Sequence, residues 1–120
     1  MAVRAIRGAT TLELDDRDHL HERTQELLAA LLSGNGLTTD DVISVFFTCT
    51  PDITSDFPAA AARGLGFGAV PLMCAQEMNV PGALARVVRV MMHIETQLSR
   101  TDVNHVYLHD AVALRRDLAQ

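Results

Sequence analysis

The sequence has 120 residues, of which 48% are hydrophobic and 21% charged, and its formal net charge is -5. This length and composition predict one soluble globular domain over residues 1–120 with a single hydrophobic core, and they argue against disorder. The net negative charge gives no sign of a basic surface that would bind nucleic acid or an anionic membrane. An anionic ligand would therefore need a local cluster of positive charge.

All ten basic residues are arginine, which excludes Schiff-base chemistry on lysine and a P-loop lysine. Arginine instead supplies permanently charged, fork-shaped donors that suit carboxylates and phosphates. The only cysteines, Cys49 and Cys74, form no paired framework and are typical of a reducing cytosol. Because neither a signal-peptide core nor a membrane-spanning apolar stretch is present, we expect a cytoplasmic protein without a membrane partner.

The beginning of the chain predicts a strand followed by a helix. Residues 3–12 are rich in β-branched and apolar side chains, and Gly8 within them marks a bulge or a close approach. Asp15 and Asp16 are candidate caps for a helix that continues to about Ser33, because leucines recur there at helical spacing.

The middle of the chain predicts two more strands and a short helix. Thr38 caps a single turn, and the apolar run 42–49 then predicts a strand that is covered on both faces. Asp56 is the candidate cap of a short helix over 58–63, with proline at its first position. A glycine-rich turn ends this helix, and residues 69–74 predict the third strand.

Residues 84–97 are ambiguous, because their apolar positions fit both a helix and a strand that places Arg89 on one face. Their β-branched residues favour the strand. Residues 103–109 predict a final strand, which a turn follows. Strands and helices mixed in this order predict one sheet with helices packed against it. The family resemblance given below narrows this to an α+β fold, a mixed sheet with helices packed on one side.

Arg89 lies among apolar residues, although a guanidinium cannot lose its charge in a protein. Its burial would require an anionic partner or a wet pocket. Glu77 and Cys74 supply a carboxylate and a thiol nearby in sequence, and Arg7 and Arg115 lie near the chain ends. We interpret these groups as a small site for an anionic molecule. A structural Arg89–Glu77 ion pair, or an arginine whose stem packs while its head reaches water, remains an alternative.

Other chemical signatures are missing from the sequence. His93, His105 and His109 have no metal-binding spacing with the cysteines or with one another, so no metal site is predicted. The glycine-rich segment 64–68 is not followed by a lysine-bearing helix start, and no serine or cysteine lies in a nucleophile elbow.

Seven fragments occur in order along residues 2–118, and together they resemble one family. The fragments are Arg7-Gly8-Ala9-Thr10-Thr11, Thr50-Pro51-Asp52, Phe57-Pro58-Ala59, Cys74-Ala75-Gln76-Glu77-Met78, Arg89-Val90-Met91-Met92, His105-Val106-Tyr107-Leu108 and Leu114-Arg115. In this combination the sequence resembles the monofunctional chorismate mutases of the trimeric pseudo-α/β-barrel class. The resemblance implies a homotrimer, with three sheets forming a barrel-like core and active sites between subunits. It also assigns residues 84–97 to a strand.

The resemblance further implies which residues line each active site. One subunit would contribute Arg7, Cys74, Glu77, Arg89, Tyr107, Leu114 and Arg115, and the adjacent subunit Phe57, Ala59 and Arg63. Met73 is also expected at the substrate, although a small polar residue is usual in the family at this position.

The implied reaction is the Claisen rearrangement of chorismate to prephenate, which needs neither metal nor cofactor. By the resemblance, Arg89 would donate to the ether oxygen as the C–O bond breaks. Arg7 and Tyr107 would hold the enolpyruvyl carboxylate, and Glu77 and Cys74 would bind the ring hydroxyl.

The remaining residues of the implied site would bind the rest of the substrate. Phe57 and Leu114 would form its apolar wall, and Arg63 and Arg115 would face the ring carboxylate. Two other functions stay open, because a fold does not fix a function. One is an enamine or imine deaminase on a similar trimeric scaffold, with Glu77 as the base, and the other is a non-catalytic binder of carboxylated metabolites.

Overall fold

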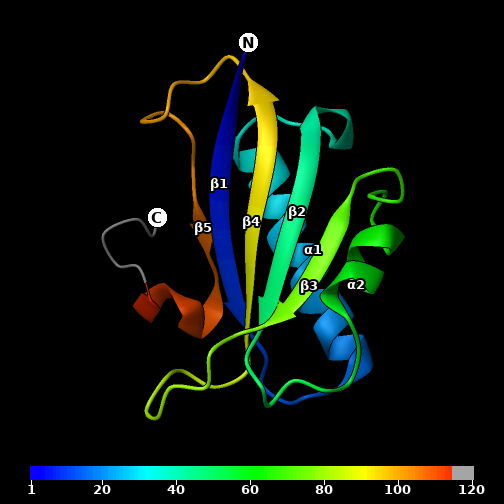
Figure 1. Cartoon of the computed structure of the whole chain (residues 1–120), viewed down its shortest axis with the longest axis vertical. Helices are drawn as coiled ribbons and strands as arrows, with labels where there is room; N and C mark the ends of the chain where they lie inside the picture. Colours follow the sequence, from blue (N-terminus) through cyan, green and yellow to red (C-terminus); the bar gives the residue numbers. More distant parts are fainter. Residues whose placement is uncertain (115–120) are drawn as a thin grey trace.

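Alternation of apolar and polar residues produces one five-stranded sheet in the computed structural model, which describes residues 1–114 (Figure 1). The strands are β1 (Ala2–Thr11), β2 (Val42–Cys49), β3 (Leu72–Gln76), β4 (Val87–Thr96) and β5 (Val106–Tyr107). The helices are α1 (Arg17–Gly34) and α2 (Pro58–Gly64), with the 3₁₀ turns η1 (Thr39–Asp41) and η2 (His109–Leu114).

The strand order is β3-β2-β4-β1-β5, with β4 at the centre. β4 runs antiparallel to both of its neighbours, whereas β2 pairs with β3, and β1 with β5, in parallel. The sheet is therefore mixed, and the prediction of an α+β fold is confirmed. The ambiguous segment 84–97 contains a strand, as its β-branched residues favoured.

The hydrophobic core lies between one face of the sheet and the two α-helices. In Figure 1, α1 passes behind the strands and α2 lies beside β3. Leu27 and Leu31 of α1 are fully buried against this face of the sheet. Gly8 permits that contact, because a Cβ atom there would lie 3.0 Å from Leu27 Cδ1 and 3.0 Å from the Val106 carbonyl oxygen. The β1–β4 pairing continues without a shift through Gly8, so the glycine marks a close approach and not a bulge.

The opposite face, which we call the open face, carries exposed apolar side chains on four strands. They are Val3 (60% exposed), Phe46 (44%), Met73 (60%) and Met91 (40%). The prediction that residues 42–49 are covered on both faces is therefore wrong for a single chain. The end of the open face near η2 is covered by other described residues, and Ala9, Val87, Tyr107 and Ala111 form a small second core there.

Two strands differ in extent from the prediction. β3 begins at Leu72 rather than at residue 69, because the chain is still turning there, with the Val70 amide bonded to the Phe67 carbonyl. β5 has only two residues instead of seven. The imidazole Nδ1 of His105 accepts the Arg7 amide at 2.9 Å, so the backbone ladder to β1 is replaced by a side-chain contact there.

The start of α2 also differs from the prediction. Phe57 is the N-cap residue, and the helix has no side-chain cap. The Asp56 carboxylate instead accepts the Phe57 amide at 2.7 Å and bonds His21 Nε2 at 2.7 Å and Arg17 Nε at 3.1 Å. Asp56 thus joins α1 to the segment that precedes α2.

Candidate active site

A hollow of about 270 Å³ opens on the open face of the sheet, at its β1–β5 side. It is lined by Arg7, Gly8, Phe46, Thr48, Glu77, Arg89, Val90, Met91 and Tyr107. We call it the arginine hollow. Its residues come from β1, β2, β4, β5 and the segment after β3, so the sheet brings together groups that are far apart in sequence.

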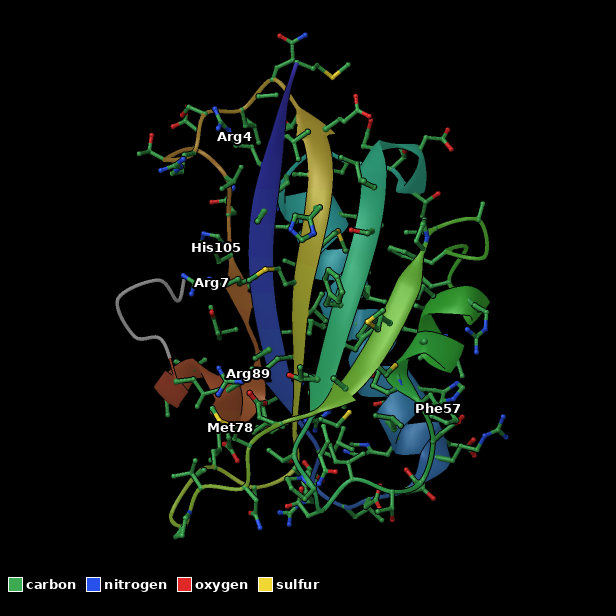
Figure 2. All side chains as sticks on the ribbon, viewed as in Figure 1. Arg4, Arg7, Phe57, Met78, Arg89 and His105 are labelled. Carbon is green, nitrogen blue, oxygen red and sulfur yellow. The ribbon has the colours of Figure 1, made fainter. Side chains whose placement is uncertain are left out.

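Strand register explains why the two arginines of this hollow are neighbours. In the β1–β4 pair, Ala9 lies opposite Arg89 and Arg7 lies opposite Met91. Arg7 and Arg89 are therefore diagonal neighbours on the same face. Both side chains extend toward the β5 side of the sheet in Figure 2.

Arg89 and Glu77 form an ion pair at the edge of the arginine hollow. Arg89 Nε lies 3.0 Å from both Glu77 carboxylate oxygens, and the two side chains are 42% and 24% exposed. Thr48 Oγ1 donates to Glu77 Oε2 at 3.3 Å, and the Glu77 amide donates to the Cys49 carbonyl oxygen at 2.8 Å. The ion pair anticipated as a structural alternative is thus present, and it faces a cavity.

Of the two predicted residues on the β5 side, Tyr107 lines the arginine hollow and Leu114 does not. The Tyr107 residue is only 6% exposed, because Ala111 of η2 packs against it, and its remaining surface lines the hollow. Leu114 is half-buried and packs against the same small core. Arg115 lies outside the residues that the structure describes.

A second hollow, of about 480 Å³, lies between β3, the end of β2 and the start of α2. Cys74 and Phe57 line it, and we call it the Phe57 hollow. Cys74 pairs in register with the buried Phe47, so its side chain faces the helices and not the open face. The structure therefore places Cys74 with Phe57 and apart from Arg7.

Cys49 also lines the Phe57 hollow. Burial raises the pKa of its thiol to about 12, and the nearby Cys74 and Glu77 add to this increase. At neutral pH Cys49 is a thiol rather than a thiolate, and it is unsuited to nucleophilic chemistry.

The other predicted site residues lie on the β3–α2 side of the chain. Phe57 is 66% exposed and stands at the edge of the molecule opposite Arg7 (Figure 2). Arg63 is exposed in the last turn of α2, and Met73 is exposed on the open face of β3. The Ala59 side chain is 7% exposed and belongs to the core beneath α2.

Five residues that line the arginine hollow are not among the predicted site residues: Gly8, Phe46, Thr48, Val90 and Met91. Gly8, Val90 and Met91 lie in fragments that carry the family resemblance, whereas Phe46 and Thr48 lie in the run 42–49, for which the sequence predicts a strand covered on both faces. The signal was available, since Ser44, Phe46 and Thr48 alternate with Val45 and Phe47. A serine and a threonine on one side of the strand indicate that this side is not part of a dry core.

Within residues 1–114 no three His, Cys, Asp or Glu side chains gather closely enough to hold a metal ion. Over the same residues, no helix combines the length and the apolar character needed to cross a membrane.

The open-face hollow gathers two arginines, an ion-paired carboxylate and a phenol, a set of donors that suits a small carboxylated molecule. Comparison with known proteins identifies the family. The model of chorismate mutase type I matches residues 3–118, so the chain belongs to the type I chorismate mutase family.

Individual relatives cover nearly the whole chain. Chorismate mutase AroH of Thermus thermophilus is 48% identical over 97% of this chain and 96% of its own length. Chorismate mutase AroH of Bacillus subtilis is 41% identical over 99% of this chain and 94% of its own length. The solved structure of a chorismate mutase from Clostridium thermocellum superimposes with a TM-score of 0.89 at 46% identity, covering 91% of this chain and 97% of that one.

Proposed function

We propose that this protein catalyses the rearrangement of chorismate to prephenate, and that the arginine hollow is one half of its active site. Membership of the type I chorismate mutase family supports the reaction. The observation that carries the assignment of the site is that Arg7 and Arg89, from different strands, border one hollow beside Glu77 and Tyr107.

The chemistry of these residues suits a pericyclic reaction. Such a rearrangement transfers no proton and uses no nucleophile, so it requires a folded substrate and charge placed where the transition state polarises. Arg89 would donate to the ether oxygen on which negative charge develops. Arg7 and Tyr107 would hold the enolpyruvyl carboxylate. Glu77 would bind the ring hydroxyl while its ion pair keeps Arg89 oriented.

We propose a homotrimer in which two neighbouring subunits complete each site. The arginine hollow lies at the β1–β5 side of the chain, whereas Phe57 lies at the β3–α2 side (Figure 2). Joining opposite sides of neighbouring subunits would bring Phe57 and Arg63 to the arginines. The placement of Cys74 in the Phe57 hollow suggests that it, too, comes from the neighbour.

The exposed apolar residues of the open face support the same assembly. Val3, Phe46, Met73 and Met91 are 40–60% exposed in one chain, and contiguous apolar surface of this kind is typical of subunit interfaces. Three sheets that meet through these faces would bury them and leave α1 and α2 outside. We further propose that residues 1–120 act as a single cytoplasmic domain without a nucleic-acid or membrane partner.

The test is to incubate the purified chain with chorismate, without additives, and to follow loss of its ultraviolet absorbance. Prephenate formation would support the proposal. Release of ammonia from enamine substrates, with chorismate unchanged, would indicate the deaminase. Ligand protection against thermal unfolding without turnover would indicate a binder.

A pH profile provides an independent test of the mechanism. Turnover should be nearly constant from about pH 5 to pH 8, because arginine does not titrate there and no proton is transferred. A bell-shaped profile with a limb near neutrality would contradict electrostatic catalysis by arginine.

A further inference from the structure

Arg86 has a left-handed backbone conformation, with φ of 49°, directly before β4 and three residues before Arg89. This conformation is strained for a residue that has a Cβ atom, and it persists only where the surrounding structure enforces it. The contacts that enforce it therefore also determine where β4 begins.

The Asp52 carboxylate makes the principal contact with the Arg86 backbone. The Arg86 amide donates to Asp52 Oδ2 at 2.9 Å and to Oδ1 at 3.2 Å. Oδ1 also accepts the Thr50 hydroxyl at 2.6 Å, and that hydroxyl oxygen accepts the Val87 amide at 2.9 Å. The Thr50 amide donates to the Val87 carbonyl oxygen at 3.1 Å. One carboxylate thus connects the end of β2 to the first residue of β4.

Arg86 is also bound to the end of β1. Its carbonyl oxygen accepts the Leu12 amide at 2.9 Å, and its guanidinium Nε donates to the Leu12 carbonyl oxygen at 2.9 Å. The ends of β1 and β2 and the start of β4 therefore meet at Arg86, at the lower end of the sheet in Figure 1.

The contact between Asp52 and Arg86 matters because the segment between Glu77 and Arg86 is exposed and has few other contacts through its side chains. Met78 and Val80 are 82% and 55% exposed, so their side chains contribute little packing. At one end of the segment the Glu77 amide is bonded to the Cys49 carbonyl oxygen at 2.8 Å, and at the other end Asp52 holds Arg86. These two anchors fix the ends of the segment that connects Glu77 to the strand carrying Arg89.

We propose that Asp52 is a positioning residue for the reaction: by holding Arg86 in its left-handed conformation, it sets the start of β4 and the orientation of Arg89 toward Glu77. This inference rests on the proposed function. Asp52 acts here through hydrogen bonds, because Oδ1 accepts both the Thr50 hydroxyl and the Arg86 amide and Oδ2 accepts the Arg86 amide at the shorter distance.

The test compares Asp52→Ala with Asp52→Asn in the chorismate assay. Asp52→Ala should lower kcat about ten- to hundredfold with little change in KM, because a small misplacement of Arg89 is felt most in the transition state. Asp52→Asn keeps an acceptor at the Oδ1 position but replaces Oδ2, which accepts the Arg86 amide at 2.9 Å, with an NH₂ donor, so its kcat should lie between those of the wild type and Asp52→Ala. Asp41→Ala is the matched control, because Asp41 accepts the Thr38 amide at 2.9 Å in η1, outside the arginine hollow.

A second substitution tests the backbone mechanism. Glycine adopts positive φ freely, so Arg86→Gly in the Asp52→Ala background should restore part of the lost kcat. It also gives a foldable variant if Asp52→Ala alone is too unstable to assay. A folded Asp52→Ala enzyme with wild-type kcat would overturn the inference, as would an Asp52→Asn enzyme as impaired as Asp52→Ala or a folded double variant without recovery. Absence of turnover in the wild-type chain would instead refute the proposed function.

Discussion

The two faces of β4 have opposite roles, although their residues alternate along one strand. Val90 and Met92 face the helices and are 3% and 0% exposed, whereas Met91 is 40% exposed and the Arg89 side chain 42% exposed on the open face. The helix-covered face is a completed core within one chain. The open face carries the ion pair and apolar surface that a substrate and neighbouring subunits would cover. Stability and function should therefore respond separately to changes on the two faces.

The largest effect is expected from Arg89→Ala, on the open face. The substitution removes a donor to the charge that develops in the transition state. It should lower transition-state stabilisation by at least about 3 kcal/mol, which is some hundredfold in kcat/KM. The unfolding midpoint should change little. The control is Arg100→Ala, which removes the same charge from an exposed residue outside the arginine hollow. Near-wild-type turnover by Arg89→Ala would refute the assignment of Arg89.

Met92→Ala tests the covered face of the same strand. Truncation of this fully buried side chain leaves a cavity and should lower the free energy of unfolding by about 3 kcal/mol. Met91→Ala should lower it by less, because Met91 is 40% exposed in one chain and only assembly would cover it. Chemical denaturation at one fixed protein concentration provides the comparison, since assembly adds to apparent stability. Equal losses for both variants would contradict the contrast between the faces.

Val3→Asp tests whether the open face forms the subunit interface. Val3 is 60% exposed in one chain, and a carboxylate there would lose hydration in a trimer but not in a monomer. We expect dissociation at micromolar concentration in sedimentation experiments. Leu14→Asp is the matched control, because Leu14 is 55% exposed in the loop after β1. If both variants remain trimeric, the interface lies elsewhere.

The smallest effect is expected for the contribution of the Asp56 carboxylate to the free energy of unfolding at acidic pH. A hydrogen bond with His21, with further bonds to the Phe57 amide and Arg17, lowers the pKa of this carboxyl to about 2. Because the folded-state pKa is lowered, the stabilisation is complete above the unfolded pKa of about 4 and is lost as pH falls toward 2. The stability difference between wild type and Asp56→Asn should therefore shrink between pH 4 and pH 2. A constant difference would show that the carboxylate does not contribute through its charge.

The sequence predicted the elements whose hydrophobic pattern is complete within the segment. The leucines of α1 and the apolar run of β2 placed these elements to within about two residues, the usual uncertainty of element ends. The Arg89–Glu77 pair was likewise foreseeable, because a guanidinium among apolar residues needs an anionic partner. Family motifs spread along the chain supported the strand assignment of β4.

Local sequence could not predict features that depend on a partner strand. The face on which Cys74 lies follows from its pairing with Phe47, and the short length of β5 follows from the His105 contact with the Arg7 amide. Neither contact is visible within its own segment, because the residues that cause it are distant in the chain.

The sequence by itself determined the family, the α+β class and the permanent positive charge of the candidate site, because these depend on residue identity and short-range spacing. Only the tertiary structure decided that Arg7 and Arg89 share one hollow, that Cys74 lies apart from them, and that Asp52 holds Arg86 in a strained conformation. Strand register determines the first two, and register is fixed by how whole strands bury their apolar faces together. The third arises where the segment after β2 meets the residue before β4, which are distant in the sequence.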